Sequence, residues 1–132
     1  MRERSLVPAL IIGVAVATIL TAIARGDQTE SGNDWLDFCE RALSDSPPLS
    51  ADEAKALACL GFVHASYYTA MIVRDLAGNP NSVGFCGKAG IPNGQLARIF
   101  VKYLQDHPER LHHPAAFLAY EAWQSAFPCT SS

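Results

Sequence analysis

Four cysteines set the strongest limit on how this 132-residue chain can fold. They stand at Cys39, Cys59, Cys86 and Cys129, separated by 20, 27 and 43 residues. Zinc sites place their ligands at short spacings such as Cys-x-x-Cys, so this wide spacing does not favour a metal site. In an exported protein a small, even number of cysteines predicts disulfides, here two bridges with three possible pairings.

The N-terminus predicts export. Arg2 and Arg4 precede a mostly apolar run from Leu6 to Ala24, which ends in the small residues of Ala22-Ile23-Ala24. A short basic leader, an apolar run and small residues at a cleavage site are the layout of a secretory signal peptide. A retained membrane anchor is the alternative, since about 18 apolar residues can span a bilayer. Either way, the remaining chain is exported.

We therefore expect a signal peptide at 1–24, a short polar linker at 25–32 and one domain at 33–129. Contact with the membrane is expected only if residues 1–24 are not cleaved. The chain has a formal net charge of −3 and no basic stripe, so nucleic acid is not an expected partner. A domain of this size has a modest core, which disulfides help to stabilise.

Apolar residues at three- and four-residue spacings predict an all-α domain, a small bundle of four to five helices. We expect helices near 33–44, 51–76, 94–107 and 114–127, separated by segments rich in proline, glycine and asparagine. In the second helix Gly61 shares a face with Ala58 and Ala65, which predicts the close approach of another helix. In the fourth helix the apolar stripe comprises Phe117, Leu118, Ala122, Trp123 and Ala126, and we expect it to pack in the core.

The helix positions narrow the disulfide pairing. Cys39 lies about five residues before the break between the first two helices, and Cys59 about nine residues after the second helix starts. In an antiparallel helix pair these positions lie at similar heights. We therefore predict Cys39–Cys59, which leaves Cys86–Cys129.

The order of several short motifs resembles one family across about residues 33–129. The motifs are Cys59-Leu60-Gly61-Phe62-Val63, Gln95-Leu96 with Lys102-Tyr103-Leu104, His107-Pro108, His113-Pro114-Ala115 and Ala126-Phe127-Pro128-Cys129. They are similar to those of the Rap/Tai immunity proteins of type VI secretion systems. The resemblance implies a small helical periplasmic protein, often a homodimer, that inhibits a peptidoglycan amidase toxin by occluding its active site.

On this interpretation the binding surface is the irregular segment 77–93. It is long, it is held by Cys86, and its polar residues Asn79, Asn81 and Ser82 together with Lys88 are the expected partner contacts. A periplasmic interaction or envelope domain without a toxin partner is the alternative function. We expect no enzyme activity, because no Ser/His/Asp or Cys/His set forms a recognisable motif. We also expect no cofactor and no metal, since His107, His112 and His113 suit helix capping or solvent exposure.

Overall fold

The structure is a computed structural model that describes residues 30–45 and 50–129. It contains four α-helices: α2 (Gly32–Ala42), α3 (Ser50–Leu76), α4 (Asn93–Asp106) and α5 (Ala115–Ala126). Two short 3-10 turns, η1 (Pro80–Ser82) and η2 (Pro108–Arg110), lie between them. The all-α class is confirmed and each helix lies close to its predicted range, whereas the predicted signal peptide lies outside the described residues.

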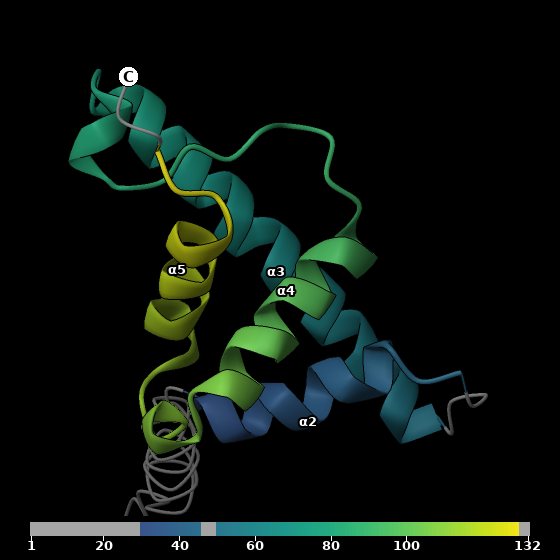
Figure 1. Cartoon of the computed structure of the whole chain (residues 1–132). Helices are drawn as coiled ribbons and strands as arrows, with labels where there is room; N and C mark the ends of the chain where they lie inside the picture. Colours follow the sequence, from purple (N-terminus) through teal and green to yellow (C-terminus); the bar gives the residue numbers. More distant parts are fainter. Residues whose placement is uncertain (1–29, 46–49, 130–132) are drawn as a thin grey trace, which may run out of the picture.

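The long helix α3 is the element on which the other helices pack (Figure 1). Its inner side carries Cys59, Val63, Tyr67 and Ala70, all buried in the core. The core continues through α4 and α5, whose largest fully buried side chains are Leu96, Phe100, Leu104, Leu118 and Trp123. By length and composition alone, α3 could also cross a membrane over Asp52–Leu76.

The first helix is fixed to α3 by a disulfide, an aromatic stack and ion pairs. Cys39 and Cys59 form a fully buried bridge, one of the two pairs that the helix layout predicts. Next to it the rings of Trp35 and Phe62 stack with their centroids 4.0 Å apart. At the surface of the same interface Asp37 forms ion pairs with Arg41 and Lys55, and Arg41 also pairs with Asp52. The hydrogen bonds from Arg41, and secondly from Lys55, lower the pKa of Asp37.

The turn between α4 and α5 packs against the start of α2. Ser31 is the N-cap residue of α2. Its backbone N–H and its hydroxyl donate to the Asp34 carboxylate at 2.9 and 2.8 Å. The Gly32 N–H donates to the His113 carbonyl at 3.1 Å. Tyr103 on α4 and Glu121 on α5 are joined by a hydrogen bond of 3.0 Å from the Tyr103 hydroxyl to the Glu121 carboxylate. Burial, and secondly this hydrogen bond, raises the pKa of Tyr103.

One prediction about packing is wrong: the small residues on α3 do not meet another helix within the described chain. Apart from the neighbouring residues and backbone of α3 itself, no described heavy atom lies within 4 Å of where a Cβ would stand at Gly61. We call the exposed apolar and small residues on this side of α3 its outer face; they are Ala54, Leu57, Ala58, Gly61, Ala65, Ile72 and Leu76. Both sides of α3 are apolar, so the sequence does not show which side faces the core. In the structure the buried Cys39–Cys59 bridge directs the side that carries Cys59 towards the core.

The expected core stripe of the fourth helix also needs a correction. Leu118, Ala122 and Trp123 are buried, but Phe117 is 67% exposed and Ala126 is exposed as well. The buried side of α5 includes Ala115 and Ala119 instead, and these small residues let the helix lie close to its neighbours. Phe117 consequently projects away from the core.

Replacing Cys39 and Cys59 together with alanine should lower the free energy of unfolding by about 3 kcal/mol, because without the bridge the unfolded chain regains the entropy of an open loop. The two cysteines are 20 residues apart in the sequence. Urea denaturation of the oxidised protein measures this change. A loss well below ~1 kcal/mol would contradict a stabilising role for this bridge in the α2–α3 interface.

Candidate partner-binding loop

The segment 77–93 joins α3 to α4 across the upper part of Figure 1 and alternates between exposed and buried stretches. The described residues of 77–82 and those of 88–90 are exposed, whereas 83–87 lie against the protein, with Phe85 and Gly87 fully or nearly buried. The loop thus presents two separate exposed stretches on either side of an internal anchor.

The C-terminal residues hold this anchor from one side. Cys86 forms a disulfide with Cys129, the second pair that the helix layout predicts. The Cys86 N–H also donates to the Phe127 carbonyl at 2.8 Å. Beside it the Phe85 ring meets the rings of Tyr67 and Phe127 edge-on. The loop is therefore joined covalently and by packing to the end of the chain.

Side chains from α3 hold the second half of the anchor. The Tyr67 hydroxyl donates to the Lys88 carbonyl at 2.8 Å, and Arg74 Nη1 donates to the Gly87 carbonyl at 2.6 Å. Tyr67 is fully buried, and burial raises the pKa of its hydroxyl, which stays protonated as a donor. The carbonyls of Gly87 and Lys88 are thus both held by α3, while the Lys88 side chain remains exposed.

Side chains from α5 hold the first part of the internal anchor, at Val83. The Tyr120 hydroxyl and Gln124 Nε2 both donate to the Val83 carbonyl, at 2.6 and 2.9 Å. Together with the contacts from α3, these bonds fix the carbonyls of Val83, Gly87 and Lys88 in a loop that has no regular structure of its own beyond η1. A loop fixed in this way is preorganised before any partner arrives.

Gly87 is required by close packing. A Cβ at this position would collide with the Phe85 ring and with the Tyr67 hydroxyl. Any larger residue would therefore displace one of the two groups that anchor the loop. The sequence shows only that Gly87 is one of several glycines in an irregular segment, so this role is visible only in the structure.

The four predicted contact residues fall into two groups. Asn79 and Ser82 shape the η1 turn: Asn79 Oδ1 accepts from the Asn81 N–H at 3.0 Å, and Ser82 Oγ donates to the Asn79 carbonyl at 2.7 Å. The side chains of Asn81 and Lys88 are exposed and make no hydrogen bond or ion pair with the described residues. Among the predicted residues, these two have side chains available to a partner.

A hollow of about 420 Å³ lies between the end of α3 and the loop. It is lined by Arg74, Asp75, Gly78 and Cys86. The Arg74 guanidinium bonds the Asp75 carboxylate at 2.7 Å, and Asp75 is well exposed. The hollow can therefore accept a polar or charged side chain of a partner. The sequence analysis did not predict that Arg74 belongs to this site. An arginine near the end of a mostly apolar helix is a pattern that could have indicated such a role.

The histidines do not form a shared site. His107 Nδ1 lies 2.8 Å from the Tyr103 carbonyl at the end of α4, and His64 Nδ1 lies 2.9 Å from Asn93 Oδ1. The rings of His112 and His113 lie side by side on the surface, with centroids 4.3 Å apart. Across residues 30–45 and 50–129, no three His, Cys, Asp or Glu side chains are grouped so that they could hold a metal ion.

Comparison with known protein families gives a match over most of the chain. The sequence model of a family described as Rap1a immunity proteins matches residues 31–129, which include all four helices, the loop and all four cysteines. No curated protein and no solved structure gives a significant match. The family match starts at the residue that caps α2 and ends at the cysteine that anchors the loop.

Gly87→Ala should destabilise the protein by about 1–3 kcal/mol, because the added methyl group overpacks the space between Phe85 and Tyr67. Lys88→Ala is the matched control: it leaves the backbone carbonyl that Tyr67 binds and should change the stability by less than ~0.5 kcal/mol. Chemical denaturation of both variants makes the comparison. Equal stability of the two variants would show that the anchor around Gly87 tolerates displacement.

Proposed function

The chain belongs to the Rap1a immunity protein family, and from this premise we propose that it binds and inhibits a peptidoglycan amidase toxin of a type VI secretion system. The proposed site of action is the periplasm, after export directed by residues 1–24. The proposed mechanism is stoichiometric occlusion: the loop 77–93 docks over the active-site cleft of the amidase and keeps peptidoglycan out. The protein acts as a binding partner and not as an enzyme.

The observation that supports this role is the way the loop is held. A disulfide and side chains from both α3 and α5 fix the backbone of residues 83–88, while the described side chains of 77–82 and those of 88–90 remain exposed. Ordering a free loop on binding costs affinity, roughly 0.5–1.5 kcal/mol for each immobilised flexible side chain and more for the backbone. A loop that is already ordered in the folded protein loses less entropy on binding, so an inhibitor with such a loop binds more tightly.

Lys88 is the charged residue best placed for recognition. Within the described part of the chain, Lys88 and Arg98 are the basic side chains without an ion pair. The backbone of Lys88 is fixed by the hydrogen bonds from Tyr67 and Arg74, so its side chain leaves the loop from a defined position. An acidic rim around the cleft of the amidase would complement it, and complementary charge raises association rates and specificity.

The proposed compartment fits the same geometry. Cys86–Cys129 can form and persist in an oxidising space such as the periplasm, and the loop depends on this bridge for its position. The proposal also includes a homodimer, which leaves the loop of each copy available for one toxin molecule.

The combined change Asn81→Ala and Lys88→Glu should raise the Kd for the amidase at least about tenfold, which corresponds to ~1.4 kcal/mol. The thermal midpoint should stay unchanged, because neither side chain makes a hydrogen bond or ion pair with the described residues. Isothermal titration calorimetry with purified cell-wall amidases, including any that a neighbouring gene encodes, measures the Kd, and hydrolysis of purified peptidoglycan measures inhibition.

Arg98→Glu is the control, since it makes the same charge change at an exposed, unpaired cation on α4. It should inhibit like the wild type. If the loop variant also inhibits normally, the contact surface lies elsewhere. If the wild-type protein binds no cell-wall amidase, the immunity proposal fails, and a periplasmic interaction domain without a toxin partner becomes the better account.

A further inference from the structure

The two disulfides differ in how far a reagent from solution can reach them. Cys39 and Cys59 are both 0% exposed, and their bridge lies inside the core. Cys86 and Cys129 are only partly buried, and their bridge joins the loop 77–93 to the end of the described chain. Accessible disulfides exchange with thiols far more readily than buried ones. A reductant can therefore distinguish the two bridges by access alone.

The hollow beside the loop gives such a reagent a route to one sulfur. Cys86 lines this hollow of about 420 Å³ together with Arg74, Asp75 and Gly78. A water molecule takes about 30 Å³ in the liquid, so the hollow has room for a small thiol or for the tip of a protein loop. Arg74 and Asp75 form an ion pair, and their charges offset each other. The hollow therefore does not repel a thiolate, although the chain as a whole is net negative.

We propose that the Cys86–Cys129 bridge is a site of thiol–disulfide exchange, which a dithiol reaches through this hollow and which releases the loop from the end of the chain. The buried Cys39–Cys59 bridge stays intact and keeps α2 joined to α3. The partner is a protein with two reduced thiols, which is itself oxidised in the reaction. The exchange site does not depend on the proposed function; only the effect of reduction on the toxin rests on that function.

The reaction transfers two electrons from the dithiol to the bridge. A thiolate of the dithiol attacks Cys86 Sγ from the hollow, the bond between the two sulfurs breaks, and Cys129 Sγ leaves with the electron pair and takes up a proton. The second thiol of the dithiol loses its proton and attacks the mixed disulfide. Cys86 then leaves as a thiolate, and the dithiol becomes a disulfide.

Reduction loosens the internal anchor of the loop and leaves the rest of the fold in place. Four side chains still donate hydrogen bonds to the loop carbonyls, namely Tyr67, Arg74, Tyr120 and Gln124. What is lost is the covalent bond that keeps residues 83–87 beside Phe127, to whose carbonyl the Cys86 N–H donates. A segment without this cross-link opens more often, so its amides exchange faster with solvent.

Reduction under native conditions tests the proposal on the full-length protein, exported and purified from the periplasm in its oxidised form. Dithiothreitol is the reductant, N-ethylmaleimide stops the reaction at intervals, and peptide mass mapping identifies the labelled cysteines. Cys86 and Cys129 should be labelled together, at least about tenfold faster than Cys39 and Cys59, because access limits the exchange.

Two variants test whether the attack passes through the hollow. Asp75→Asn removes the negative charge from its wall and should speed the reaction with the dithiothreitol thiolate about twofold or more. Asp106→Asn is the matched control, because Asp106 is also an exposed, ion-paired aspartate but lies on α4, away from the hollow. It should leave the rate unchanged.

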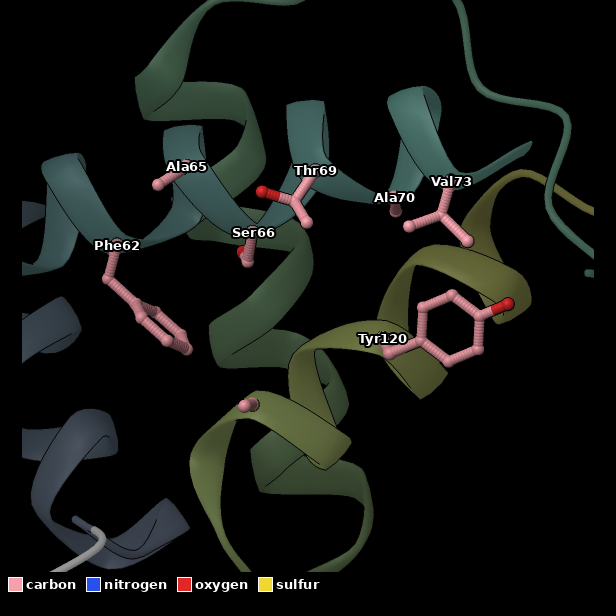
Figure 2. A pocket seen from close by; sticks show the side chains of 8 residues that line it. Phe62, Ala65, Ser66, Thr69, Ala70, Val73 and Tyr120 are labelled. Atoms are coloured by element: carbon pink, nitrogen blue, oxygen red, sulfur yellow. The ribbon is translucent and has the colours of Figure 1, made fainter. Parts of the chain in front are cut away.

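Hydrogen exchange of the selectively reduced protein measures the release of the loop. The amides of 83–87 should exchange at least about fivefold faster, since their opening no longer has to occur within a closed covalent ring. The internal reference is the α3–α5 surface, the groove of about 370 Å³ between these helices that the residues labelled in Figure 2 line. Its helical amides should keep their exchange rates.

A permanently open variant checks the result without a reductant. Cys86→Ser combined with Cys129→Ser should show the same fast exchange at 83–87 and no response to dithiothreitol. Far-ultraviolet dichroism establishes that this variant and the reduced wild type are folded.

Selective labelling of Cys86 and Cys129, followed by faster exchange at 83–87, supports the proposal. Resistance of both bridges, labelling of all four cysteines at one rate, or unchanged exchange at 83–87 after reduction overturns it, as does an Asp75→Asn rate equal to that of the wild type. The Kd for the amidase is measured in parallel. If reduction frees the loop while this Kd stays the same, the exchange site stands and the proposed inhibitory role of the loop fails.

Discussion

Tyr67 joins the core of this protein to its most exposed segment. Its ring is fully buried and meets Phe85, Trp123 and Phe127 edge-on, with centroids 5.4 to 5.6 Å apart. Its hydroxyl donates to the Lys88 carbonyl in the loop. The position of α3 in the core therefore determines the position of the loop. Because a buried donor without a partner is costly, the hydrogen bond and the core packing favour each other.

The two disulfides serve different parts of this arrangement. Cys39–Cys59 is fully buried and joins α2 to α3, so it fixes the rotation of the helix that carries Tyr67. Cys86–Cys129 is half-buried and joins the loop to the end of the chain. The first bridge orients α3, and the second holds the loop 77–93 against the folded domain. On our proposal, this division gives a small protein a rigid surface for a toxin.

The sequence predicts most of the architecture because its signals are local. Helix periodicity and the breaking segments place all four helices, and helix heights alone select the two cysteine pairs that the structure contains. The motifs around the helices and cysteines also identify the immunity protein family correctly. These features depend on neighbouring residues or on simple helix geometry.

What the sequence does not predict depends on tertiary contacts. Both sides of α3 are apolar, so periodicity cannot show that the side with Gly61 faces outward, and the same ambiguity hides the exposure of Phe117. The anchoring roles of Tyr67 and Arg74 need carbonyl partners 21 and 13 residues away. The role of Asn79 in its own turn, where its Oδ1 accepts from the Asn81 N–H, is likewise visible only in the structure.

Hydrogen exchange of the backbone amides, measured by mass spectrometry with and without the amidase, tests the central claim most directly. If the loop is the inhibitory surface, the amidase should slow exchange in the exposed stretches 77–82 and 88–90. Residues 83–87, already held by the core and the disulfide, should change little. Protection confined to the α3–α5 surface, or no protection anywhere in 77–90, would contradict the account.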